Sequence, residues 1–192
     1  RRRIARDLHD GVLQDISYTA AALGLIMLEA EGTGLGEELQ NAVDAIRRSA
    51  QGLREAVDDL RLEDEEGRPF PELVESLVRR VRTMARDVET SLEVEEGFPT
   101  ASLGETGTQL LRIIQEAVTN ARRHSGAKRV SVSLRIEESN LVSEISDNGR
   151  GFGSETSPGM GLRSMRERAA LIGGELEIES EPGQGTSVQV RL

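Results

Sequence analysis

The apolar residues between positions 39 and 60 are separated by alternating steps of four and three residues. This heptad seam is typical of helices that pack side by side in a left-handed bundle. It restricts the N-terminal part of the chain to a helix-on-helix architecture, because a helix with such a stripe needs another helix to cover it. The seam residues are Leu39, Val43, Ile46, Ala50, Leu53, Val57 and Leu60.

A further helix is predicted before the seam. Apolar residues mark one helix face from Ile4 to Ile26, and the glycine-rich residues 32–36 are typical of a tight loop. Because a hairpin of two helices has little core of its own, we expect residues 1–62 to pair with a second copy in a homodimeric four-helix bundle. The alternative is a hairpin that packs against the rest of its own chain.

The C-terminal part of the chain mixes helical and strand periods. It follows a charged, proline-containing segment, residues 63–70, which we interpret as a linker. In residues 71–192, helices stacked on one face of a mixed sheet are expected, and the whole chain is assigned to the α+β class. The expected helices are 71–90, 103–124 and 161–172, and the expected strands are 91–95, 130–136, 141–146, 175–179 and 187–191.

Composition excludes several classes of function. A net charge of −10 argues against a nucleic-acid partner. The absence of Cys excludes disulfides and thiolate metal sites and suits the reducing cytoplasm, where we expect this chain. The longest apolar run, residues 20–28, is about half of the roughly 20 residues needed to span a bilayer, so no membrane contact is expected. The first residue is not Met, and we expect a fragment with any sensor region upstream.

An acidic residue and two glycines follow the predicted strand 141–146, in the pattern Asp147-x-Gly149-x-Gly151. The carboxylate can accept a hydrogen bond from the exocyclic amine of adenine, and the glycines let the backbone pass close to a ligand. Taken alone, the pattern is also typical of an ordinary glycine turn.

A second glycine-rich segment opens the predicted helix 161–172. It contains Gly159, Gly161 and Leu162. Glycines at a helix start suit phosphate binding, because the backbone N–H groups and the helix dipole both favour an anion there. The alternative is a flexible loop followed by a helix start.

Polar residues share one face of the predicted helix 103–124. Glu116 and Asn120 lie four residues apart, and Arg123 follows one turn later. The amide oxygen of Asn120 is a suitable ligand for Mg²⁺ held mostly by phosphates and waters, and Arg123 can bind a phosphate. By themselves, such residues would indicate a solvated helix face.

The order of these three segments resembles the Bergerat-type ATP fold of histidine kinases, gyrase-type ATPases, heat-shock chaperones of the ninety-kilodalton class and mismatch-repair ATPases. Residues 183–186, which end in Thr186, resemble the closing motif of that fold. The resemblance implies that Asn120 binds Mg²⁺, that Asp147 reads the adenine of ATP, and that residues 148–161 form a lid over the phosphates. It leaves Glu116 as a base or an orienting group.

The segment that contains His9, Asp10 and Gln14 resembles the phosphoacceptor motif of the histidine kinases that work with NarL/FixJ-type response regulators. Residues 120–125 and 161–169 resemble the same subfamily, so the resemblance covers nearly the whole chain. It implies that His9 accepts the γ-phosphoryl group and that Asp10 acts as its base. It also implies that Asp10 and Gln14 align a water for removing phosphate from the response regulator.

The sequence around the two histidines agrees with this assignment. His9 lies beside Leu8 rather than on the apolar stripe, so its ring is expected to reach solvent, where a neutral imidazole is a competent nucleophile. His124 follows Asn120 by four residues and is expected near the nucleotide, where it packs or orients a phosphate. It is the weaker candidate for the acceptor.

We therefore predict a kinase that moves phosphate from ATP to His9 and then to a response regulator. One departure concerns Arg123, where many members of the subfamily carry Lys, which leaves the geometry of its phosphate contact open. The alternatives are a degenerate kinase that only docks a regulator, another enzyme of the same fold such as a gyrase-type ATPase or a serine-directed anti-sigma kinase, and a structural coiled coil.

Overall fold

In a computed structural model the chain divides into two compact units, Arg1–Glu66 and Gly67–Leu192. The structure describes residues 67–85, 87–153 and 159–192 of the second unit, and residues 16, 18, 19, 22, 23, 39–46, 49 and 53 of the first. The predicted phosphoacceptor residues His9, Asp10 and Gln14 lie outside the described residues, as does most of the expected hairpin. Within the described ranges, no helix is both long enough and apolar enough to cross a membrane.

Residues 39–46 of the first unit are helical, as the seam predicts. Val43 on the seam is buried, with 1% of its surface exposed, and Leu39 and Ile46 are half-buried. Asn41 and Ala45, which lie off the seam, are exposed. The burial of this short stretch follows the seam.

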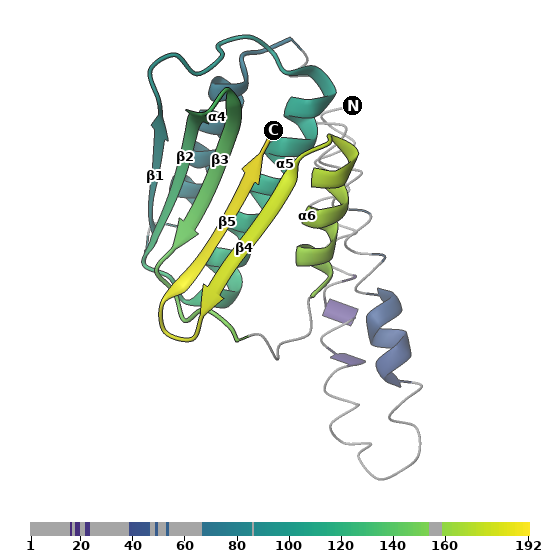
Figure 1. Ribbon diagram of the computed structural model, residues 1–192. Helices are drawn as coiled ribbons and strands as arrows, with labels where there is room; N and C mark the ends of the chain where they lie inside the picture. The colour runs from purple at the N-terminus through teal and green to yellow at the C-terminus, as the bar shows by residue number, and fades with distance from the viewer. Residues whose placement is uncertain are drawn as a thin grey trace. The chain divides into compact units, whose positions relative to one another are not determined.

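The second unit is built on the mixed five-stranded sheet that the alternating segments predict, in the order β1-β2-β3-β5-β4 (Figure 1). β1 runs parallel to β2, and the other neighbouring strands are antiparallel. The antiparallel pair β2 and β3 is the predicted hairpin. The strands are β1 (Glu89–Val94), β2 (Arg129–Glu137), β3 (Asn140–Asp147), β4 (Glu175–Glu181) and β5 (Gly185–Arg191).

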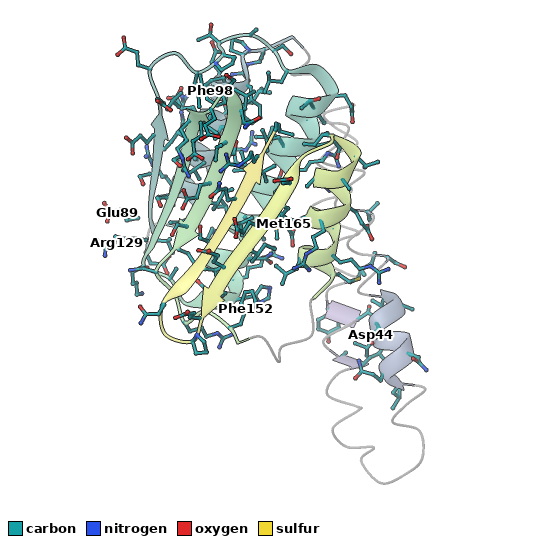
Figure 2. All side chains as sticks on the ribbon, viewed as in Figure 1. Asp44, Glu89, Phe98, Arg129, Phe152 and Met165 are labelled. Carbon is teal, nitrogen blue, oxygen red and sulfur yellow. The ribbon has the colours of Figure 1, made fainter. Side chains whose placement is uncertain are left out.

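Helices cover one face of this sheet, as expected for the predicted sandwich (Figure 1). They are α4 (Phe70–Met84), α5 (Gly104–Asn120), its continuation as the π-helical turn η3 (Ala121–Ser125), and α6 (Met160–Leu171). Met165 of α6 is buried, with 1% exposed, on the helix that packs against β4 (Figure 2). The core therefore lies between the helices and one face of the sheet.

The predicted helix over 71–90 is wrong at its C-terminal end. α4 begins at Phe70, which is fully buried, and ends at Met84. Thr90 belongs instead to β1, where it is paired with Val130 and its carbonyl accepts a hydrogen bond of 2.6 Å from Arg82 Nε. A β-branched residue packs well in a strand, and pairing with β2 outweighs the helical period at this point.

The strand register decides which side chains face the helices. Buried residues of neighbouring strands are paired in register, such as Val132 with Ile145 and Ile145 with Val188. The same register places Asp147 opposite Val130 and Thr186. Because side chains alternate along a strand, Asp147 and Thr186 lie on the helix-facing side, at the end of their strands. The sheet thus positions a carboxylate at the rim of the core.

The opposite face of the sheet carries a network of charged residues. Glu137 accepts hydrogen bonds from Arg135 Nε at 2.6 Å and from the Arg191 guanidinium at 2.8 Å. Arg135 also binds Glu144, which accepts a hydrogen bond of 3.1 Å from Ser187. The network crosses β2, β3 and β5, and each of its four charged residues has a partner of opposite sign.

The hydrogen bond from Arg135 holds the pKa of the Glu137 carboxyl below its usual range, against the opposing effect of desolvation. Because the folded-state pKa is depressed, the carboxylate stabilises the fold above its unfolded pKa of about 4.3, and this contribution is lost as pH falls through the folded value. We expect Glu137→Gln to lower stability at pH 7 and to approach the wild type at low pH.

Urea unfolding followed by circular dichroism between pH 7 and pH 2 measures this difference. Glu177→Gln is the matched control, because Glu177 is an exposed residue of β4 that faces the same side of the sheet. A Glu137→Gln deficit that stays constant across this range, or one equal to that of the control, contradicts the prediction.

Candidate functional site

Asp147 starts a tight turn at the end of β3. One of its carboxylate oxygens, Oδ1, accepts a hydrogen bond of 2.7 Å from the backbone N–H of Gly149. This Asx turn leaves the second carboxylate oxygen outside the bond. Asp147 is half-buried, so its free acceptor lies at the rim of the core, where a ligand donor can reach it.

The loop after Asp147 is hydrogen-bonded to the end of η3 and to the start of β2. The N–H of Arg150 donates to the carbonyl of Ser125 at 2.8 Å. Gly149 lies so close to Ser125 that any side-chain carbon there would overlap the Ser125 hydroxyl. The side chain of Asn148 accepts hydrogen bonds from the N–H groups of Lys128 and Arg129, at 2.9 and 2.8 Å. The contacts with Ser125, Lys128 and Arg129 thus restrict the backbone of residues 148–150.

The turn between β4 and β5 holds the loop from the other side. The N–H of Gly183 donates to the Arg150 carbonyl at 2.6 Å, and the N–H of Phe152 donates to Ser180 Oγ at 2.9 Å. Ser180 Oγ lies 3.0 Å from the Thr186 hydroxyl. Figure 2 shows Phe152 at the end of the sheet where β4 and β5 are joined. The structure thereby brings the predicted closing motif against the Asp147 loop.

The predicted residues of α5 lie beside the start of α6. Gly161 approaches α5 so closely that a side-chain carbon there would overlap the Glu116 carboxylate and lie 3.2 Å from the Asn120 amide nitrogen. Glu116 and Asn120 are both half-buried. The polar face of α5 and the second glycine-rich segment, which the sequence places about 40 residues apart, are therefore neighbours.

The N-terminus of α6 has the properties of an anion site. Gly159 precedes the helix in an extended conformation, and the first turn contains no acidic residue. The unpaired N–H groups of a first turn and the helix dipole favour negative charge. Beyond Gly159 and its chain neighbours, no atom of the described residues lies within 4 Å of the position that a Gly159 side-chain carbon would take, and the neighbouring Leu162 is half-buried. Residues 154–158, which belong to the predicted lid, lie outside the described part of the chain.

A basic turn follows Asn120. In η3, Arg123 and His124 are exposed, whereas the Nε of Arg122 is buried and has no hydrogen-bond partner among the described residues. A π-helical turn places one extra residue in the helix, and such turns are frequent at functional sites. The cations of η3 come directly after the Asn120 turn that faces Gly161. Their charge suits a phosphate ligand.

Sequence reasoning gives three residues of this arrangement no role of their own: Ser125, Asn148 and Ser180. Asn148 has a recognisable signal, because Asn in a turn readily binds neighbouring backbone groups. Ser180 has none, since its contacts with Phe152 and Thr186 depend on the pairing of β4 with β5.

A groove of about 370 Å³ lies elsewhere, between α4 and β1. Its lining includes Glu75, Arg79, Leu92 and Val94 and none of the predicted site residues. Among the described residues, no group of three His, Cys, Asp or Glu side chains is arranged to hold a metal ion.

Comparison with known proteins identifies both parts of the chain. Residues 1–66 match a histidine kinase domain family, and residues 105–192 match the family described as histidine kinase-, DNA gyrase B- and HSP90-like ATPase. Together the two matches take in every predicted site residue from His9 to Thr186.

Two relatives match along the whole chain. The oxygen sensor histidine kinase NreB of Staphylococcus carnosus (strain TM300) is 29% identical over 200 residues, which cover 100% of this chain and 56% of the relative. The sensor histidine kinase LiaS of Bacillus subtilis (strain 168) is 32% identical over 197 residues, which cover 100% of this chain and 53% of the relative. The chain thus spans about half the length of these relatives.

The fold also resembles solved structures. The histidine kinase domain of the blue-light activated kinase from Erythrobacter litoralis EL346 superposes with a TM-score of 0.60 at 17% identity, over 99% of this chain and 94% of that one. At this identity the likeness concerns the fold. With both domain families matched in order along the sequence, the chain belongs to the histidine kinases, and its second unit has the ATPase fold that they share with DNA gyrase B and HSP90.

Proposed function

We propose that this chain is the catalytic core of a sensor histidine kinase that transfers the γ-phosphoryl group of ATP to His9 and then to an aspartate of a response regulator. The observation that carries the proposal is the meeting of three separate segments at one end of the sheet. The Asp147 loop, the Asn120 turn of α5 and the Gly161 start of α6 converge there. Together they offer an acceptor for adenine and donors for phosphate.

ATP is the substrate that fits these groups. The free carboxylate oxygen of Asp147 is an acceptor suited to the exocyclic amine of adenine, while its other oxygen holds Gly149. The start of α6, with Gly159 and Gly161, and the cation of Arg123 suit the phosphates. Thr186 is paired with Asp147 in the sheet and supports the adenine end of the site.

Mg²⁺ fits the same place, with Asn120 as its protein ligand. The amide of Asn120 and the carboxylate of Glu116 are oxygen donors at the start of α6, where the phosphates are proposed to lie. When bound, Mg²⁺ neutralises phosphate charge. Glu116 is proposed to orient the groups that surround the proposed Mg²⁺ position at the start of α6. A single amide ligand agrees with a metal held largely by phosphates and waters.

The proposed reaction at His9 is a single nucleophilic displacement at the γ-phosphorus of ATP. A ring nitrogen of neutral His9 forms a bond to the γ-phosphorus, and the bond from that phosphorus to the β–γ bridging oxygen breaks, which releases ADP. Asp10 accepts the proton from the other ring nitrogen. The phosphorus–nitrogen bond then breaks when an aspartate of the response regulator attacks the same phosphorus, and His9 leaves as neutral imidazole with the proton returned from Asp10.

The remaining parts of the proposal concern organisation and partners. Residues 1–62 are proposed to form the dimeric four-helix bundle and residues 71–192 the ATP-binding domain. Residues 63–70 are proposed as the linker, although its last residue, Phe70, already begins α4 and is buried in the second unit. A response regulator of NarL/FixJ type is the proposed partner, and Gln14 is proposed to align water for its dephosphorylation. Since ATP is the proposed phosphoryl donor, this core is proposed to lie in the cytoplasm.

Asp147→Asn tests the adenine assignment. In the variant the amide oxygen can stay with Gly149, and the amide nitrogen then faces the adenine amine, so that two donors meet. We expect ADP affinity to fall about 10-fold to 100-fold, as for a buried group left without its partner. Isothermal titration calorimetry with ADP and Mg²⁺ measures this loss.

Asp87→Asn is the matched control, because Asp87 is exposed in the turn between α4 and β1 and undergoes the same chemical change. The control is expected to bind ADP as the wild type does. Equal affinities for the wild type and Asp147→Asn would remove Asp147 from the nucleotide site. A wild type that binds neither ADP nor ATP would overturn the proposed function as a whole.

A further inference from the structure

The side chain of Asn148 makes an unusual set of contacts for an exposed residue. Its Oδ1 accepts from two consecutive backbone N–H groups, those of Lys128 at 2.9 Å and Arg129 at 2.8 Å. The backbone N–H of Asn148 also donates to the Arg129 carbonyl at 3.2 Å. These three bonds join the first residue after Asp147 to the start of β2.

The start of β2 is itself fixed by the neighbouring strand. The Lys128 carbonyl accepts a hydrogen bond of 2.9 Å from Glu89, where β1 begins, and Glu89 is paired in register with Arg129. Figure 2 shows Glu89 and Arg129 together at this edge of the sheet. Asn148 therefore fastens the Asp147 loop to a point that two strands hold in place.

This attachment bears on Asp147 because the two residues are adjacent. The Asx turn fixes only the relation between the Asp147 carboxylate and Gly149. The position of that turn relative to the sheet depends on Asn148 on one side and on Ser125, which accepts from Arg150, on the other. A shift of about 1 Å in the turn would misdirect the free carboxylate oxygen, and misplacements of that size are costly at binding and catalytic sites.

We propose that Asn148 is a positioning residue that acts through Asp147 to set the preference of the site for purines with a 6-amino group. The inference rests on the proposed function and adds a determinant of base specificity to it. Asn148 does not touch the base in this account. It holds the acceptor of Asp147 where the amine of adenine can donate and where the 6-oxo group of hypoxanthine meets a carboxylate oxygen.

A role limited to stability predicts a different outcome. Lys128 and Arg129 are exposed, so water can replace the side-chain acceptor when Asn148 is shortened. The backbone pairing of Val130 with Asp147 does not involve the Asn148 side chain. Removal of Asn148 Oδ1 should therefore alter the loop more than the fold.

Calorimetric titration of the full chain with ADP and with IDP, both with Mg²⁺, tests this inference. We expect the wild type to prefer ADP, and Asn148→Ala to lose about tenfold in ADP affinity and most of its preference over IDP, with a much smaller change for IDP. Asn148→Asp should keep both properties, because a carboxylate oxygen can accept the same two N–H groups. Asn148→Ser, with a shorter acceptor, should lie between the two.

Asn140→Ala, at the opposite end of β3, is the control for the same truncation and is expected to leave the ADP/IDP ratio unchanged. The inference is overturned if Asn148→Ala weakens ADP and IDP equally, if it binds both as the wild type does, or if Asn148→Asp behaves like Asn148→Ala. If Asn148→Ala does not fold, the ADP/IDP preference of Asn148→Ser is compared with that of Asn148→Asp instead. Equal preferences in these two variants overturn the inference. A wild type without affinity for either nucleotide refutes the proposed function, and the inference falls with it.

Discussion

Gly185→Ala is expected to destabilise the second unit and to weaken ADP binding about a hundredfold, whereas Gly183→Ala is expected to leave binding intact. Both glycines have positive φ angles, +89° for Gly185 and +84° for Gly183, so both substitutions carry a backbone cost of about 1–2 kcal/mol. Only Gly185 is also confined. A side-chain carbon there would overlap the Asp147 carbonyl oxygen and lie 3.1 Å from the Cα of Asn148, whereas nothing lies within 4 Å at Gly183.

The difference follows from which atoms must move. At Gly185 the obstruction is backbone, namely the strand end and turn that carry the proposed adenine acceptor, and relief requires β3 and β5 to separate where Asp147 pairs with Thr186. Such overpacking adds about 1–3 kcal/mol of destabilisation. Displacement of Asp147 is expected to reduce ADP affinity by about a hundredfold.

Thermal unfolding and ADP titration of the two variants measure these effects side by side. The loss of stability in Gly183→Ala measures the cost of the positive φ angle alone. Subtracting it from the loss in Gly185→Ala gives the cost of the steric overlap with Asp147. Equal melting temperatures and equal ADP affinities for the two variants would show that the contact between Gly185 and Asp147 is unimportant.

The sequence predicts the elements of the second unit well because most of them have a clear period. The strand pair β2 and β3, the helix α6 and its stop at Gly173, which has a φ of +68°, all follow from local patterns. The error at Thr90 has a different origin. The predicted helix runs to residue 90, but Glu89 and Thr90 pair with Arg129 and Val130 of β2, 40 residues later, and therefore belong to β1.

The sequence predicts the motifs of the candidate site, but it does not predict the contacts that hold these motifs in place. The acidic turn at Asp147 and the glycines of α6 are visible as local patterns, and the structure brings them to the same end of the sheet. Sequence spacing does not reveal which glycine is sterically required. Gly183 and Gly185 look alike in the sequence, and only the pairing of β3 with β5 distinguishes them. The same holds for the contact of Ser180 with Thr186.

His9→Gln is expected to abolish transfer of phosphate to the protein while ADP and ATP binding stay as in the wild type. The amide of Gln cannot form the phosphorus–nitrogen bond, and His9 belongs to the domain that is proposed to accept phosphate rather than to the one that binds ATP. The chain has two histidines, so His124→Gln is a matched control. At saturating ATP, His124→Gln should still be phosphorylated.

Incubation of the chain with γ-labelled ATP and Mg²⁺, followed by treatment of the product with acid and with base, tests the central claim most directly. We predict that the wild type and His124→Gln acquire a label that acid removes and base does not, and that His9→Gln acquires none. A label that survives acid, or one retained by His9→Gln, would contradict phosphorylation at His9. ADP binding without any label in the wild type would indicate instead a module that binds nucleotide without acting as a kinase.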